Sequence, residues 1–247
     1  MDERPTPRVL VADDDPVSLE FLTSALRELG CAVVGAASGR ATLAACAQSA
    51  CDLLLLDRRM PGLGGAPLLR ELHRAGCTAP AVATSAELDA PARAELAAAG
   101  YVDAVTKPIG MERLAMLLAT HLPQWRGRRH GSGANVSAAA LAASAEPALL
   151  EDGPALASVG GDGQTLRALR SLLAQELESV SARIAVLPAP ELGDWLHRLR
   201  ASCRYCGAMR LLDVAERLES ELKRSGDAGR DELLAAVSAT ISALGKA

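Results

Sequence analysis

Two patterns of apolar and polar positions divide this chain. In the first half, short apolar runs alternate with segments whose apolar residues recur at helical spacing. The predicted strands cover residues 8–12, 32–36, 52–56, 80–84 and 101–105. The predicted helices cover residues 16–29, 39–49, 64–75, 88–98 and 110–121. This alternation predicts an α/β doubly wound fold, with a five-stranded parallel sheet covered by helices on both faces.

The second half has a different pattern. From residue 149 onward, helical periodicity is interrupted only by short polar loops, and strand signals are absent. This predicts an all-α four-helix-bundle domain with a short lead-in helix. The intervening residues 123–148 are rich in Gly, Ala, Ser and Arg, which is typical of a flexible linker. We therefore expect one domain over 1–122 and a second over 149–247.

Charge and composition argue against a nucleic-acid-binding protein and against a membrane-spanning one. The net charge is −4, and residues 1–122 carry 11 basic and 15 acidic side chains, against 12 and 14 in residues 149–247. Neither half is basic enough to favour a nucleic-acid surface. No apolar run approaches the roughly 20 residues of a membrane span, and the polar start MDERPTPR is unlike a signal peptide. Six scattered cysteines are typical of free thiols in a reducing cytoplasm, where we expect the protein to be located.

Chemically active side chains follow the predicted strands. Ligands bind beyond the carboxyl ends of parallel strands, so residues placed there should converge. The set consists of Asp13, Asp14, Asp57, Thr84, Ser85 and Lys107. Crowded carboxylates repel one another, and a hard cation such as Mg²⁺ relieves that repulsion. A lysine and a hydroxyl beside the cation would hold the oxygens of a transferring phosphoryl group.

These residues resemble the receiver domain of two-component response regulators over residues 7–122. The motifs that carry the resemblance are VLVADDDP, LLLLDRRMPGLGG and TKP. The resemblance implies that Asp57 is the phosphoacceptor and that Asp13, Asp14 and the backbone carbonyl of Arg59 hold Mg²⁺ with it. Ser85 lies 22 residues before Lys107 and matches the family hydroxyl better than Thr84.

Two further expectations concern the surroundings of this site. The family commonly has an aromatic residue three positions before the lysine, where this chain has Ala104. Tyr101 is expected on the opposite face of the last strand, so it should not replace that aromatic residue. Arg59 and Glu87 each lie two positions beyond a site residue. We expect them to pair across the pocket mouth and to hinder the attacking water.

The segment WLHRLRASC in the second half has a histidine on its polar face. At about 100° per residue, His197, Arg200 and Ala201 share one side of the helix, opposite an apolar side that contains Cys203 and Cys206. A histidine on such a face is either a solvated residue or an accessible nucleophile. We expect this face to be exposed to solvent and the two cysteines to be packed thiols.

The segment HRLRASCRYCGA resembles the signature of histidine phosphotransfer domains, and the resemblance extends over residues 149–245. It implies that His197 carries a phosphoryl group, with Arg200 as a neighbouring cation and Ala201 as the small residue one turn away. The family usually has lysine and glycine at these last two positions. Arginine still supplies the positive charge, and alanine is only slightly larger than glycine.

The sequence therefore predicts a phosphorelay signalling protein. Asp57 would take a phosphoryl group from a sensor histidine kinase, and His197 would exchange one with Asp57 or with another receiver domain. No ATP-binding kinase motif is present, so the chain is not expected to be a kinase. The alternative is a phosphorylation-switched receiver domain whose bundle is a non-phosphorylated docking module. The oligomeric state, the cognate kinase and the direction of phosphoryl flow stay open.

Overall fold

The computed structural model describes residues 6–125, 148–225 and 229–245. The chain divides into two compact units, residues 1–127 and 128–247. Most of the predicted linker, residues 126–147, lies outside the described residues. No helix in the described ranges is both long enough and apolar enough to cross a bilayer.

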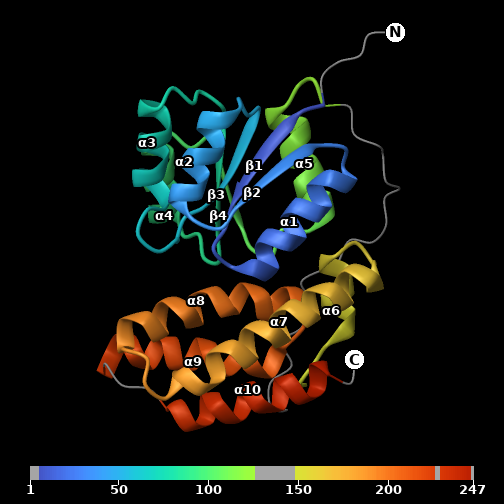
Figure 1. Cartoon of the computed structure of the whole chain (residues 1–247), viewed down its shortest axis with the longest axis vertical. Coiled ribbons are helices and arrows are strands. Elements are labelled where there is room, and N and C mark those ends of the chain that lie inside the picture. The colour runs from blue at the N-terminus through green and yellow to red at the C-terminus, as the bar shows by residue number, and fades with distance from the viewer. Residues whose placement is uncertain (1–5, 126–147, 226–228, 246–247) are drawn as a thin grey trace. The chain divides into compact units, whose positions relative to one another are not determined.

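The first unit is a five-stranded parallel sheet with helices on both faces (Figure 1). The strands are β1 (Arg8–Ala12), β2 (Ala32–Ala36), β3 (Leu53–Asp57), β4 (Ala81–Ser85) and β5 (Asp103–Thr106), in the spatial order β2-β1-β3-β4-β5. The helices are α1 (Pro16–Glu28), α2 (Gly39–Gln48), α3 (Gly65–Arg74), α4 (Ala90–Ala98) and α5 (Met111–His121). Helices α1 and α5 cover one face, and α2, α3 and α4 cover the other. The predicted fold class is confirmed for this unit.

The central strands of this sheet are apolar and buried on both faces. All five residues of β3 and all five of β4 are buried, as expected for strands covered by helices on both sides. Helices α1, α2 and α4 each begin at a residue whose side chain caps the helix. Asp15 caps α1 by accepting from the backbone N–H groups of Val17 and Ser18. The last residue of the DDD run therefore has a structural role, while the first two stay at the carboxyl end of β1.

The second unit is a helical bundle. It consists of α6 (Asp152–Ser158), α7 (Gly163–Ile184), α8 (Ala189–Cys206), α9 (Met209–Ser225) and α10 (Arg230–Leu244). Helix α7 packs against α8 and α10, and α9 packs against the same two helices, so the four long helices close around one core. The predicted bundle with a short lead-in helix is confirmed.

Helix α8 ends at a glycine for a steric reason. Gly207 has the left-handed φ of 72°, which favours glycine at the C-terminal end of a helix. A Cβ atom at this position would lie 2.2 Å from the carbonyl oxygen of Glu151. The backbone N–H of Glu151 donates to the carbonyl oxygen of Gly207, so the segment before α6 lies directly on the end of α8.

Candidate functional site

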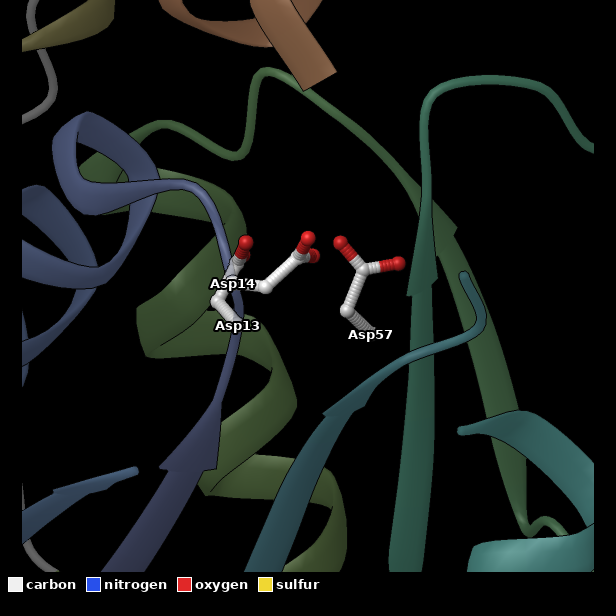
Figure 2. A group of neighbouring side chains, drawn as sticks. All are labelled: Asp13, Asp14 and Asp57. Atoms are coloured by element: carbon white, nitrogen blue, oxygen red, sulfur yellow. The ribbon is translucent and has the colours of Figure 1, made fainter. Parts of the chain in front are cut away.

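Three carboxylates from two adjacent strands meet at the carboxyl edge of the sheet. Asp57 is the last residue of β3, and Asp13 and Asp14 follow β1 directly. One carboxylate oxygen of each lies within 4.8 Å of the others, and Figure 2 shows the three carboxyl groups gathered between the ends of these strands. The parallel pairing of β1 with β3 brings these positions together. The structure therefore brings the three aspartates together, as the sequence predicts.

Lys107 places one positive charge among these carboxylates. Its Nζ forms an ion pair with Asp13 Oδ2 at 2.5 Å and a second one with Asp57 Oδ2. The backbone N–H of Lys107 donates to the carbonyl oxygen of Ser85, which anchors the lysine to the end of β4. One cation among three carboxylates leaves an excess of negative charge. Such an oxygen-rich set suits a hard divalent cation.

Burial and neighbouring charges act together on the pKa values of Asp13 and Lys107. Burial of Asp13 raises the pKa of its carboxyl group, and the negative charge of Asp57 raises it further, although the ammonium group of Lys107 opposes both effects. Burial alone would lower the pKa of Lys107, but the carboxylates of Asp13 and Asp57 raise it above its usual value. Lys107 is therefore a permanent cation at neutral pH. A bound cation would favour the ionised form of Asp13 in the same way.

The loops that follow β3 and β4 border the carboxylate cluster. The backbone N–H of Arg59 donates to Asp57 Oδ1 at 2.9 Å, which places the loop after β3 against the predicted phosphoacceptor. The hydroxyl of Ser85 donates to the carbonyl oxygen of Glu87 at 2.8 Å. Thr84 is paired in register with Asp57, and its hydroxyl is buried without a hydrogen-bond partner among the described residues. The pairing of Arg59 with Glu87 stays a prediction.

A second charged cluster surrounds His197 on α8. The His197 Nδ1 atom lies 3.5 Å from Glu219 Oε1 on α9. The same carboxylate accepts from Arg200 Nη1 at 2.8 Å and from Lys223 Nζ at 2.8 Å. Arg200 Nε also lies 3.4 Å from the carboxylate of Glu216. Glu219 is thus a carboxylate surrounded by three nitrogen-bearing side chains.

The solvent exposure predicted for this face of α8 stays a prediction. Within the helical unit, His197 and Arg200 on the polar face of α8 pair with Glu219 on α9. A helical wheel separates polar from apolar residues, but it does not tell which neighbouring helix contacts the polar side. Cys203 is fully buried, as expected for a packed thiol.

Glu219 is the residue that the sequence reasoning missed. Burial alone would raise the pKa of Glu219, but hydrogen bonds from His197, Lys223 and Arg200 hold that pKa well below its usual value. The side chain is therefore an anion that only accepts hydrogen bonds, so Nδ1 of His197 must be the donor. The lone pair of the neutral imidazole then lies on Nε2. The available signal was the recurrence of Glu216, Glu219 and Lys223 at helical spacing in the segment that follows the GA turn.

Residues 9–119 match the family model of the response regulator receiver domain. The first unit is a receiver domain. The match covers β2 to β5 in full, and β1 and α5 except for one residue and two residues respectively. The carboxylate cluster with Lys107 is therefore the acidic pocket of a domain that belongs to two-component signalling.

Relatives of known function extend the match beyond the receiver domain. Sensor protein GacS of Pseudomonas syringae pv. syringae is 30% identical over 229 residues, covering 89% of this chain and 25% of that protein. Signal transduction histidine-protein kinase BarA of Escherichia coli (strain K12) is 28% identical over 236 residues, covering 90% of this chain and 24% of that protein. The chain spans about a quarter of the length of these curated relatives. Alignments of this length include most of the helical unit.

Among solved structures, one similar protein is the receiver domain of sensor histidine kinase PA1611 from Pseudomonas aeruginosa PAO1, with a magnesium ion coordinated in its active site cleft. It is 27% identical, with a TM-score of 0.44, and covers 47% of this chain and 98% of that one. The Francisella response regulator 1452 receiver domain is also 27% identical, with a TM-score of 0.46, and covers 49% and 100%.

The surroundings of Ala104 in the receiver domain correct one expectation. Tyr101 is buried in the same hydrophobic cluster as Ala104, between the sheet and α3 and α4. The prediction that it lies on the opposite face is wrong because β5 begins only at Asp103, so strand alternation does not apply to residue 101. Arg93 on α4 donates from Nη1 to the carbonyl oxygen of Ala104 at 2.9 Å. An arginine from α4 thus reaches the backbone of β5 where related receiver domains are expected to have an aromatic side chain.

Proposed function

We propose that this protein transfers phosphoryl groups between histidine and aspartate in a phosphorelay, with Asp57 and His197 as its two phosphoacceptors. The observation that carries the proposal is that each proposed phosphoacceptor contacts a side chain of the charge that phosphoryl transfer requires there. Asp57 contacts Lys107 in a carboxylate-rich pocket, and His197 contacts Glu219 beside Arg200. The match of sensor proteins to nearly 90% of the chain supports a joint role of both units.

The first step concerns Asp57. A carboxylate oxygen of Asp57 would attack the phosphorus atom of a phosphohistidine on a sensor histidine kinase. The oxygen–phosphorus bond forms as the nitrogen–phosphorus bond breaks, and the imidazole of the donor leaves with its electron pair. Lys107 Nζ, which contacts Asp57 Oδ2, is positioned to bind an oxygen of the arriving phosphoryl group.

Asp13, Asp14, Asp57 and the backbone carbonyl of Arg59 are the proposed ligands of Mg²⁺. The three carboxylates fit this ion because they supply oxygen ligands from one small, negatively charged pocket. When bound, the ion offsets the repulsion between the pocket and an anionic phosphoryl group. Among the residues of this chain, Ser85 is the proposed donor to a further phosphoryl oxygen, and its hydroxyl would have to turn away from Glu87.

The second step concerns His197. Nε2 would attack the phosphorus atom of an aspartyl phosphate, and the oxygen–phosphorus bond of that acyl phosphate would break. Glu219 accepts from Nδ1, so it orients the ring and stabilises the positive charge that develops on the imidazole. Arg200 forms an ion pair with the same carboxylate, and its positive charge would offset the negative charge of the phosphoryl oxygens. We place this exchange in the cytoplasm, because all six cysteines are free thiols.

The first step is tested by labelling the protein with radioactive acetyl phosphate in the presence of Mg²⁺. A His197→Gln chain should acquire a label that is lost in alkali, as an acyl phosphate is, and a His197→Gln chain that also carries Asp57→Asn should acquire none. Asp52→Asn is the matched control, since Asp52 is exposed and lies just before β3 rather than at its carboxyl end. A label of equal amount in the chain with both substitutions would contradict the assignment.

A further inference from the structure

Three cysteines gather at the edge of the receiver sheet that is opposite Asp57. Cys46 lies near the end of α2, Cys51 lies two residues before β3, and Cys77 lies between α3 and β4. Helix α2 runs back from the carboxyl edge, so its end lies where the chain enters the neighbouring strands. All three side chains are partly buried against the same hydrophobic cluster beneath α3. Three separate segments thus bring their thiols to one place.

Cys46 is the central member of this thiol cluster, which consists of Cys46, Cys51 and Cys77. Its side chain packs against the same hydrophobic cluster as the other two thiols, and both of them raise its pKa. Each of the three is partly exposed, whereas the other three cysteines of the chain are buried. A small reagent in solution can therefore reach this cluster of three thiols.

The environment favours sulfur–sulfur chemistry over metal binding. In the described part of the chain, the group with metal-site spacing is the aspartate cluster, and the three thiols do not form such a group. Burial, followed by the two neighbouring thiols, raises the pKa of Cys46 to about 12. Little thiolate is present at neutral pH, so spontaneous oxidation should be slow and should accelerate as the pH rises.

We propose that Cys46 and Cys77 form an intrachain disulfide when a small-molecule disulfide, such as oxidised glutathione, reacts with the receiver domain. The Cys46 thiolate attacks one glutathione sulfur, and the glutathione disulfide bond breaks to release one glutathione thiolate. The Cys77 thiolate then attacks the Cys46 sulfur of the mixed disulfide and releases the second glutathione. Two protein thiols are oxidised, one glutathione disulfide is reduced, and the two protons pass to the released thiolates. The bond would join the end of α2 to the segment after α3.

The test uses the full-length chain with Cys51→Ser, because trypsin leaves Cys46 and Cys51 in one peptide, residues 41–58, and Cys77 in another, residues 75–93. The protein is incubated with oxidised glutathione, remaining thiols are alkylated, and the digest is analysed by mass spectrometry. We expect the two peptides joined with the loss of two hydrogens. The joined product should form about ten times faster for each pH unit between 7 and 9.

Two controls separate this pairing from others. Cys31→Ser should give the same joined product, because Cys31 is buried and lies outside the thiol cluster. Cys46→Ser should give none, while it still accepts label on Asp57, which shows that the variant is folded. The proposal is overturned if Cys51→Ser yields only glutathione adducts, or if Cys46→Ser joins the two peptides as fast as the wild type.

Discussion

The two charged clusters of this protein are opposite in sign. In the receiver domain, one lysine lies among three carboxylates, and the predicted nucleophile is one of the carboxylates. In the helical unit, one carboxylate lies among three nitrogen-bearing side chains, and the predicted nucleophile is the histidine. A carboxylate nucleophile needs positive charge to tolerate an incoming phosphate, whereas an imidazole needs an acceptor that orients it. The parallel sheet thus supplies a cation to a carboxylate nucleophile, and the helical bundle supplies a hydrogen-bond acceptor to an imidazole.

The largest effect is expected from removal of one carboxylate of the receiver cluster. Asp14→Asn should lower acetyl phosphate labelling of Asp57 on the order of 100-fold, because it removes a proposed ligand of the charge-compensating ion. The same variant should lose the Mg²⁺-dependent rise in melting temperature, which for the wild type reflects about 2.7 kcal/mol at an ion concentration 100 times the dissociation constant. Melting curves with and without Mg²⁺ measure this directly. Equal melting temperatures for the wild type under both conditions would contradict the ion site.

A smaller effect is expected from Glu219 in the opposite cluster. Glu219→Gln should slow phosphoryl uptake by His197 roughly tenfold, because the ring loses its charged acceptor while the nucleophile itself stays. Glu216→Gln is the matched control, since Glu216 lies on the same helix and pairs with Arg200 and Arg204. Equal rates of phosphoryl uptake in these two variants would contradict the positioning role of Glu219.

The lowered pKa of Glu219 leads to a prediction about how the free energy of unfolding depends on pH. The pKa of folded Glu219 lies well below its usual value of 4.5, so its ionised form stabilises the fold. That stabilisation is complete above the unfolded pKa and is lost as the pH falls toward the folded value. Wild type should therefore exceed Glu219→Gln in free energy of unfolding by about 1–3 kcal/mol at pH 7, and the difference should shrink below pH 4.5. Urea unfolding at several pH values checks this, and a constant difference down to pH 3 would contradict it.

The smallest effect is expected at an ion-pair network outside both clusters. Arg217 on α9 pairs with Asp213 and with Glu232 on α10, and its side chain is half exposed. Exposed pairs contribute less than about 1 kcal/mol, so Arg217→Ala should barely change the free energy of unfolding. It should also leave labelling of His197 unchanged. A large loss of labelling would show that charge anywhere on α9, and not the His197 cluster in particular, supports the transfer.

The receiver cluster could be predicted because a parallel sheet brings strand ends together. Once Asp13, Asp57 and Lys107 are assigned to the ends of their strands, their convergence follows from topology alone. The error at Tyr101 came from the start of β5, which lies two residues later than predicted. Alternation along a strand is informative only where the strand has begun.

The His197 cluster could be predicted only in part. The histidine and its neighbours on α8 are one turn apart in the sequence, so their shared face follows from helical spacing. Glu219 lies on the next helix, and it reaches His197 only because α8 and α9 pack in one particular rotation. Periodicity identifies the polar face of each helix, but it does not tell which polar faces meet. The contact of His197 with Glu219 follows from this packing and was missed for that reason.

The most direct test of the central claim is transfer between two versions of this protein. The His197→Gln chain is labelled on Asp57 with radioactive acetyl phosphate, freed of reagent, and mixed with a size-tagged Asp57→Asn chain that retains His197. Our account predicts that label appears on the tagged chain and that it is stable in alkali and lost in acid, as a phosphohistidine is. A tagged chain that also lacks His197 should stay unlabelled. If the tagged chain with His197 gains no label, or gains one that is lost in alkali, His197 is not the phosphoacceptor that we propose.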